Sequence, residues 1–212
     1  MQFKTFDLGL VDYLSAWQFQ KEVFSQVKNG LFKSALIFCQ HHPVITLGRR
    51  ADRKNILASE QELQNRRIPV YQTERGGDVT YHGPGQLLLY PILDLHYFKK
   101  DIHLFLRKLE QAIIEAIGEL GVYAQRLPGL TGVWCGNKKI ASIGVAIKNW
   151  ISFHGTAINI KRDDLDNFSL IRPCGKNIIM TSVESVLGRG ARITQVKEIL
   201  TRRLENDQSS FA

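Results

Sequence analysis

Cysteine is scarce in this chain, whose 212 residues include three: Cys39, Cys135 and Cys174. An odd, sparse set without a C-x-x-C pair argues against a disulfide scaffold and against a structural zinc site. The adjacent His41 and His42 would point to opposite faces of a strand, so they do not suggest a shared metal site either. We therefore expect free thiols in a reducing compartment, with no metal and no cofactor.

Long apolar runs and targeting signals are also missing. No run approaches the ~20 residues that a bilayer-spanning helix needs. The first seven residues lack the charged-then-apolar design of a signal peptide. We expect a soluble, cytoplasmic protein that does not associate with membranes.

A concentrated basic segment is absent, although the net charge is +8. Lysine and arginine are dispersed, and the chain has no dense basic block and no aromatic-basic RNA motif. A basic surface attracts acidic partners and speeds association. Charge alone does not choose between nucleic acid, an anionic membrane and an acidic protein.

The apolar fraction of 44% is enough for a packed hydrophobic core. No internal repeat or linker is evident in the sequence. We expect one domain over residues 1–212 with a frayed C-terminus. The mixture of helices and strands, without strict βαβ alternation, predicts an α/β fold with a mixed sheet packed against helices. Periodicity predicts helices over 12–29, 59–66, 101–121, 182–187 and 194–204, and strands over 34–40, 44–47, 70–72, 87–93, 122–124, 132–135, 139–147 and 152–160.

Three local signals refine this organisation. Asp101 is the expected cap of the clearest helix, and Gly121 is its expected end. Pro91 interrupts an apolar run, which indicates a sheet edge or a bulge there. The hairpin-rich region after Gly121 is the candidate for a second, smaller sheet.

Cys174 is the first candidate for chemistry. A free cysteine is most often a small buried hydrophobe, and Cys39, inside an apolar strand, is expected to be one. Cys135, beside a hairpin turn, is ambiguous. Cys174 differs because Pro173 and Gly175 place it on a turn, where the backbone can present the thiol to a ligand. As a thiolate it would be a nucleophile.

Lys139 is the second candidate. A lysine near a hairpin turn is usually a solvated surface charge, but residues 140–144 that follow it are small and mostly apolar. Lys139 is therefore expected to begin a strand that heads inward, where its pKa can fall and it can exchange protons near neutrality. Together, Cys174 and Lys139 suggest covalent acyl transfer.

The loop over residues 75–86 carries four glycines together with Arg, Thr, Tyr and His. It does not match the phosphate-binding P-loop pattern. The alternatives are a flexible loop and a polar pocket wall, and the polar side chains favour the wall. His82 in this loop and His154 in a second His-Gly corner are possible acids, bases or donors, although a lone histidine is more often structural.

Together these motifs resemble the lipoyl(octanoyl)transferase family. The motifs run in the family's order over most of the chain, from about residue 34 to residue 187, and the long glycine-histidine loop is the most specific. The matching segments are residues 42–48, 75–86, 131–134, 139–144, 154–159 and 173–175.

The resemblance implies a fold of the biotin- and lipoate-ligase type, in which a larger mixed sheet with helices accompanies a small sheet. It implies that an octanoyl group moves from the phosphopantetheine thioester of acyl carrier protein to a lysine of a lipoyl domain. The acceptors would be the lipoyl domains of 2-oxoacid dehydrogenases and the glycine cleavage H protein, with no nucleic acid or membrane as partner.

The resemblance also implies roles for residues. Cys174 would be the acyl-thioester nucleophile, Lys139 would lower its pKa, and His154 would be auxiliary. The substrate pocket would be lined by Arg75, Gly76, Gly77, Asp78, Val79, Thr80, Tyr81, His82, Ser142, Ile143, Gly144, Gly155, Thr156 and Ala157.

Other functions remain open from the sequence. An ATP-dependent lipoate ligase of the same fold would activate a free acid and would not need Cys174. An octanoyl relay between lipoyl domains would use a different donor, and a non-catalytic binder of lipoyl domains would need neither Cys174 nor Lys139. Nucleic-acid binding is the simplest interpretation of the charge alone.

Overall fold

The computed structural model describes residues 3–97, 100–173 and 177–206. Cys174 lies outside these residues, as does the C-terminus expected to fray from Asn206 onward, except for Asn206 itself, which ends a helix. The helices and strands are β1 (Lys4–Val11), α1 (Tyr13–Lys28), β2 (Ser34–His41), β3 (Val44–Leu47), α2 (Glu60–Asn65), β4 (Val70–Gln72), β5 (Val79–His82), β6 (Gln86–Leu93), α3 (Ile102–Gly118), β7 (Gln125–Leu127), β8 (Leu130–Cys135), β9 (Lys138–Lys148), β10 (Ile151–Asn159), α4 (Val183–Leu187) and α5 (Ile193–Asn206).

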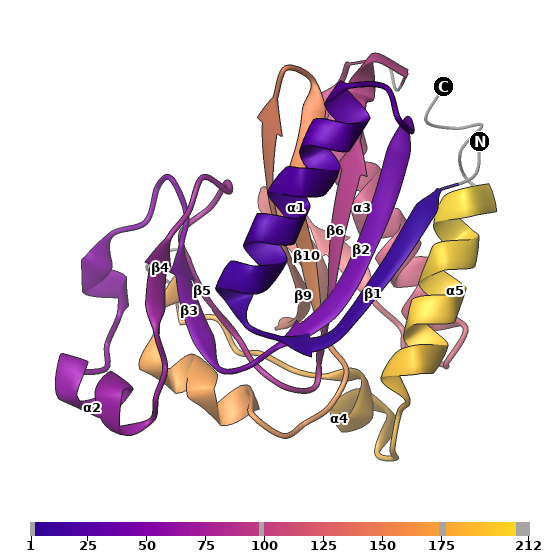
Figure 1. Ribbon diagram of the computed structural model, residues 1–212. Coiled ribbons are helices and arrows are strands. Elements are labelled where there is room, and N and C mark those ends of the chain that lie inside the picture. The colour runs from indigo at the N-terminus through magenta and orange to yellow at the C-terminus, as the bar shows by residue number, and fades with distance from the viewer. Residues whose placement is uncertain (1–2, 98–99, 174–176, 207–212) are drawn as a thin grey trace.

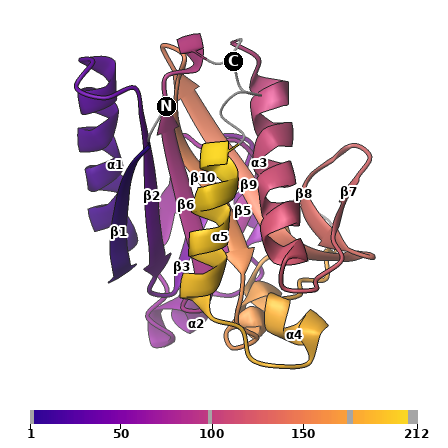
Figure 2. The same cartoon turned by 90° about the vertical axis from the view of Figure 1, so that its right-hand side faces the viewer.

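A seven-stranded mixed sheet forms the centre of the fold, in the order β1-β2-β6-β10-β9-β8-β7. β1 and β2 are parallel, and the other neighbours are antiparallel. Helix α1 lies on one face (Figure 1), and α3 and α5 lie on the other (Figure 2). The predicted mixed sheet packed against helices is therefore confirmed.

Strand alternation supplies each face with its own core. In β2, Leu36 and Phe38 belong to the cluster that α3 and α5 cover, whereas Ile37 and Cys39 belong to the cluster under α1. Successive side chains of a strand point to opposite faces, so one apolar run serves both layers. The expected burial of Cys39 is confirmed.

The edge expected at Pro91 is wrong, because β6 lies between β2 and β10 near the middle of the sheet. Two features of β10 accommodate the proline. Ser152 Oγ donates to the Pro91 carbonyl (2.7 Å) and accepts from the Leu93 N–H (3.0 Å), which replaces main-chain pairing there. Gly155 approaches Leu89 and Pro91 so closely that a Cβ atom would overlap both of them.

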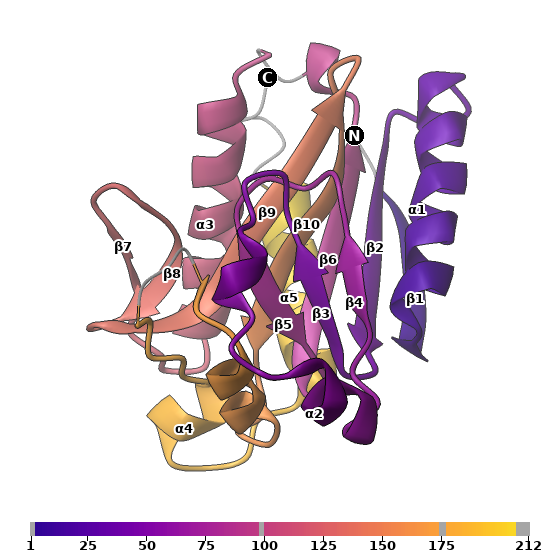
Figure 3. The ribbon, with the colours of Figure 1, turned by 90° about the vertical axis from the view of Figure 1, so that its left-hand side faces the viewer.

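The second sheet exists, but not where the sequence suggested. It contains β4, β3 and β5, in that order, whereas the strands after Gly121 belong to the large sheet. The small sheet lies on the same face of the large sheet as α1 (Figure 3). Its own core packs Ile45 and Leu47 against Leu63 of α2 and Phe168. Part of the glycine-histidine loop is thus a strand, β5, rather than loop.

Most other elements match the prediction to within a few residues, with three exceptions. β1 was not predicted, and the strand predicted over 122–124 is found three residues later, as β7, while 122–124 have no regular structure. Helix α3 ends at Gly118, three residues before the predicted end. The cap is as predicted, because Asp101 accepts a hydrogen bond from Leu104 N–H (2.9 Å). None of the described helices is both long and apolar enough to cross a bilayer.

Candidate active site

A cavity of about 420 Å³ extends from the α1 side of the large sheet, along β9 and β10, to β8 and the start of α3. Residues from segments that are distant in sequence meet around it. The residues predicted for the site that line it are Arg75, Gly76, Gly77, Asp78, Val79, Thr80, His82, Lys139, Ser142, Ile143, Gly144, His154, Gly155, Thr156 and Ala157.

Tyr81 and Cys174 are the remaining members of the predicted set. Tyr81 does not line the cavity. It is 1% exposed, and its hydroxyl donates to Asp164 (2.6 Å) in the core of the small sheet. Cys174 lies outside the described residues, but Pro173 and Ile178, on either side of the gap, both line the cavity.

Main-chain contacts fix the glycine loop against β9. Gly76 N–H donates to the Val145 carbonyl (2.8 Å), and Arg50 N–H donates to the Gly77 carbonyl (3.2 Å). Gly144 lies so near that an added Cβ would be 2.9 Å from the Gly76 oxygen. Glycine is required here because two backbones approach each other closely.

Arg75 and Asp78 hold this loop from within. The Arg75 guanidinium is buried and donates to the Thr46 carbonyl (2.6 Å) and hydroxyl (3.0 Å). The Asp78 carboxylate accepts from the Asn55 side chain (2.6 Å) and from Asp52 N–H (3.2 Å). Although both residues line the cavity, these polar contacts go to protein groups and shape the wall.

Aromatic and histidine rings form the inner end of the cavity. His82 stacks on Tyr13 with 6.4 Å between ring centroids, and its Nδ1–H donates a hydrogen bond to Gln86 Oε1 (3.1 Å). Behind it, His41 Nε2 bonds the Tyr90 hydroxyl (2.6 Å). Burial lowers the pKa of His82 to about 3 and that of His41 to about 4, so both are neutral at pH 7.

His154 occupies an unusual backbone conformation on β10, with φ 55°. Its N–H donates to Gln20 Oε1 (2.9 Å), and its Nε2 lies 3.5 Å from Glu74 Oε2. That separation places the imidazole beside the Glu74 carboxylate but is too long for a well-formed hydrogen bond. Burial lowers the pKa of His154, and the Glu74 carboxylate opposes the shift.

Three buried polar groups on the cavity wall have no hydrogen-bond partner among the described residues: Trp134 Nε1, His154 Nε2 and Thr156 Oγ1. Their residues are 3%, 2% and 2% exposed. Buried polar groups in proteins are nearly always paired, so unpaired ones invite a ligand. The cavity therefore suits a molecule that has polar atoms as well as an apolar part.

Lys139 lies half-buried near the start of β9, as expected from the apolar run that follows it. Its ammonium lies 5.4 Å from the centre of the Trp134 ring. Its N–H donates to the Ile179 carbonyl (2.8 Å), and its carbonyl accepts from Thr181 N–H (2.9 Å). The segment that follows Cys174 in sequence therefore pairs directly with Lys139.

The sequence did not point to some parts of the wall. Tyr13 and Tyr90 line the cavity, but both lie in segments whose periodicity signalled only a helix and a strand. Leu88 also lines the cavity, whereas its neighbour Leu87 belongs to the core under α3. Strand alternation explains this difference between neighbours.

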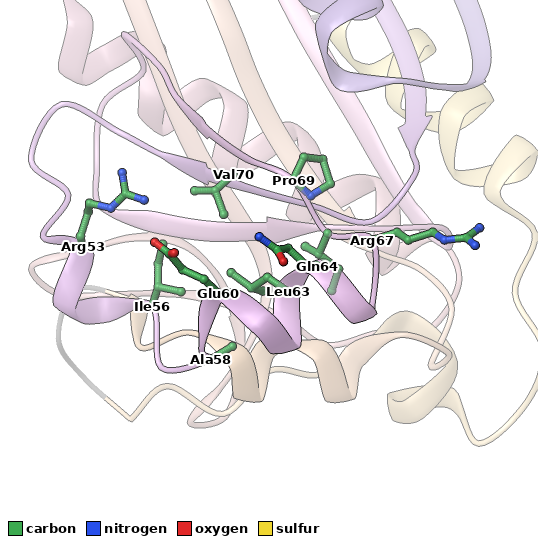
Figure 4. Close-up of a pocket in the computed structure, with 10 residues that line it drawn as sticks. Arg53, Ile56, Ala58, Glu60, Leu63, Gln64, Arg67, Pro69 and Val70 are labelled. Carbon is green, nitrogen blue, oxygen red and sulfur yellow. The ribbon is translucent and has the colours of Figure 1, made fainter.

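A second cavity of about 550 Å³ lies beside α2 (Figure 4). No residue predicted for the site lines it. Its walls are mostly aliphatic with a few polar side chains, namely Arg53, Ile56, Ala58, Glu60, Leu63, Gln64, Arg67, Ile68, Pro69 and Val70. We call it the α2 cavity, and the first one the β9 cavity.

The described part of the chain contains no candidate metal-binding site. No three His, Cys, Asp or Glu side chains there are arranged to hold an ion. Cys135, beside the hairpin turn, is half-buried, and burial raises the pKa of its thiol.

The chain is similar to known proteins over nearly its whole length. Residues 12–205 match the model of the lipoyl protein ligase A/B catalytic domain. A curated octanoyltransferase from Solibacter usitatus is 46% identical over 195 residues, which cover 92% of this chain and 88% of that protein.

Solved structures show the same fold at low identity. The bi-partite lipoate protein ligase of Thermoplasma acidophilum superposes with a TM-score of 0.69 at 17% identity, covering 97% of this chain and 83% of that one. The biotin protein ligase of Aquifex aeolicus gives 0.57 at 13% identity, covering 99% and 71%. The predicted ligase-type fold is confirmed, and the chain belongs to the lipoyl protein ligase A/B catalytic-domain family, with octanoyltransferases among its close relatives.

Proposed function

We propose that the protein transfers an octanoyl group from a thioester donor to a lysine of a lipoyl domain. The curated relative at 46% identity is an octanoyltransferase. The β9 cavity supports this activity because it combines Lys139, apolar wall residues and unpaired polar groups in one space.

Cys174 is the proposed nucleophile. It belongs to the short segment between Pro173 and Ile178, both of which line the cavity that also contains Lys139. Its thiolate would attack the carbonyl carbon of the donor thioester, and the carbon–sulfur bond to the donor would break. The departing thiolate would take a proton from Lys139, leaving an octanoyl thioester on Cys174.

The second step would reverse the proton flow. The acceptor lysine would give a proton to neutral Lys139 and attack the enzyme thioester, and Cys174 would leave as thiolate. Exchange between thioesters is nearly isoenergetic and amide formation from a thioester runs downhill, so neither step needs ATP. The nearby ammonium of Lys139 would favour the thiolate form of Cys174 between turnovers.

The apolar part of the wall would receive the octanoyl chain. Val79, Leu88, Ile143 and Val145 line the cavity, together with Ala157. Each methylene taken out of water contributes about 0.8 kcal/mol, so chain length would be sensed through buried area. The unpaired donors would meet the polar end of the substrate.

Acyl carrier protein is the proposed donor. It is typically acidic, as lipoyl domains are, and the chain carries a net charge of +8. The same attraction would serve both partners. A thiol nucleophile needs a reducing compartment, so we place the reaction in the cytoplasm.

The pairing of Lys139 with the segment after Cys174, at the cavity wall, is the observation that carries this proposal. Its test is the intact mass of the protein after mixing with octanoyl-acyl carrier protein without ATP, beside Cys174→Ser. We expect the parent to gain one octanoyl group, labile to hydroxylamine, and the variant to gain none.

Two results would contradict the proposal. The parent could stay unmodified while a lipoyl domain is acylated only when ATP and free octanoate are supplied, which would indicate a ligase. Alternatively, Cys174→Ser could transfer octanoate as fast as the parent, which would remove the covalent intermediate.

A further inference from the structure

Glu110 is a charged residue in the core. It lies on α3 and is 0% exposed, among the apolar side chains that α3 packs against the large sheet. A buried carboxylate is costly unless it is paired and hydrogen-bonded. Its position therefore calls for a specific role, and nothing in the proposed reaction uses it directly.

The Glu110 carboxylate is fully paired. Oε2 accepts from Arg107 Nη1 (2.6 Å) and from Arg126 Nε (3.1 Å). Oε1 accepts from the N–H of Gly132 (2.9 Å), in the middle of β8. One carboxylate thus connects the helix to the main chain of the strand that borders β9.

Gly132 is in direct contact with Lys139. Its φ is 127°, and a Cβ there would lie 2.5 Å from Lys139 Cε and 2.7 Å from the Ala141 oxygen. The β8–β9 register also shifts by one residue between Val133 and Trp134, beside this contact. Such an irregularity re-aims the side chains next to it.

We propose that Glu110 is a positioning residue for Lys139. Its carboxylate fixes the β8 backbone at Gly132, and that backbone forms one wall of the slot in which the Lys139 side chain lies. The segment at Ile179 and Thr181 holds the Lys139 main chain from the other side. The inference depends on the proposed function, because the proposed function is what gives Lys139 the role of exchanging protons with Cys174.

Loss of the carboxylate would act on Lys139 through the backbone. In Glu110→Gln a single amide oxygen replaces two carboxylate oxygens, so Gly132 N–H and the two guanidiniums cannot all be satisfied. Either Gly132 loses its acceptor or the arginines lose theirs. In both cases the β8 backbone is free to shift, and Lys139 Nζ shifts with the wall that supports it.

The test compares Glu110→Gln with Glu119→Gln. Glu119 lies at the end of the same helix and pairs with Arg202 and Arg203. Glu119→Gln is therefore a matched control, because it also removes a carboxylate that has two arginine partners. Two quantities are measured: the single-turnover rate of Cys174 octanoylation at several donor concentrations, and the pH dependence of Cys174 alkylation by iodoacetamide, followed by peptide mass.

We expect Glu110→Gln to slow octanoylation at saturating donor by about 10- to 100-fold, as a misplacement of about 1 Å can do. The donor concentration at half-maximal rate should change little, and the alkylation midpoint of Cys174 should move to higher pH. Glu119→Gln should leave both quantities near those of the parent. A general loss of stability would not move the alkylation midpoint of the folded protein.

Equal behaviour of the two variants would overturn the role of Glu110. Failure of the proposed function looks different, because the parent itself would then show no octanoylation or no lowered alkylation midpoint. If Glu110→Gln does not fold, Arg126→Gln carries the test, since it removes one donor to Oε2 from a partly exposed position. It should shift the midpoint in the same direction by less, and an unchanged midpoint would again overturn the inference.

Discussion

The two cavities differ in a way that their sizes do not capture. The volumes are about 550 Å³ for the α2 cavity and about 420 Å³ for the β9 cavity. The β9 cavity, however, contains three buried polar groups without partners, and none of these groups lies among the described residues that line the α2 cavity. An unpaired buried group costs about 1–3 kcal/mol. Three further groups of this kind, at Trp17, Gln20 and Ser34, line neither cavity, so it is the gathering of three such groups at one cavity that favours a ligand there.

Removal of the Lys139 amine should have the largest effect on octanoyl transfer of all the changes at the two cavities. Lys139→Met keeps an unbranched side chain, one atom shorter, and removes the proton-exchanging group, so transfer should fall by about 10²- to 10⁴-fold. The matched change on the other cavity is Gln64→Met. It should leave the rate within about twofold, since most surface substitutions have small effects. Steady-state transfer to a lipoyl domain measures both, and a large loss in Gln64→Met would assign function to the α2 cavity.

Acid should lower the stability of the folded protein through two histidines at the inner end of the β9 cavity. His41 and His82 are neutral in the folded state with pKa values of about 4 and about 3, and both would protonate near pH 6.5 when unfolded. The unfolded state therefore binds more protons below pH 6.5, and stability is lost as the pH falls from 7 to 5. Each histidine should account for about 2 kcal/mol of this loss.

His82→Gln measures that contribution. The free energy of unfolding in urea at pH 7 and pH 5 should differ by about 2 kcal/mol less in this variant than in the parent. Glu74 and Glu184 have lowered pKa values, so their contributions are lost only below about pH 4.5, outside this window. An unchanged pH dependence in His82→Gln would mean that His82 is already charged, or exposed, in the folded protein.

Filling each cavity by one substitution sharpens the comparison further. Ala157→Leu adds three carbons to the β9 cavity, so the preference for an octanoyl chain over a chain about three methylenes shorter should fall by about 2 kcal/mol, roughly 30-fold. Ala58→Leu makes the same change in the α2 cavity and should leave the preference unaltered. Competition between donors of two chain lengths measures the ratio. A shifted preference in Ala58→Leu would place the acyl chain beside α2.

The sequence predicted the local elements better than the sheets that they form. Local signals such as the Asp101 cap and the apolar strand over residues 34–40 depend on neighbours in sequence, and these were confirmed. Membership of a sheet depends on distant partners, so β5 was taken for loop, and the strands after Gly121 were assigned to the wrong sheet. Pro91 misled for the same reason, because Ser152 and Gly155, which accommodate it, lie more than sixty residues away.

The same limit applies to the site. The glycine-histidine motif identified one part of the cavity wall, residues 75–80 and 82, because those residues form one continuous segment. Glu110 carried no signal, since a glutamate within a helical pattern is usually a solvated charge, and only the structure brings it to Gly132. Tyr13 likewise joins His82 only through the packing of α1 against the sheet.

The smallest expected effect concerns the helix that borders the α2 cavity. Ser59 caps α2 by accepting from Glu62 N–H (3.1 Å). Ser59→Ala should cost about 1 kcal/mol of stability, whereas Ser59→Asn, which keeps an acceptor, should cost little. Thermal unfolding measures the difference. Because α2 contributes no residue to the β9 cavity, octanoyl transfer below the unfolding temperature should be equal in the parent and both variants. A rate that falls in Ser59→Ala and recovers in Ser59→Asn would show that the order of α2 matters to the reaction, and the two cavities would then have to be treated as one functional unit.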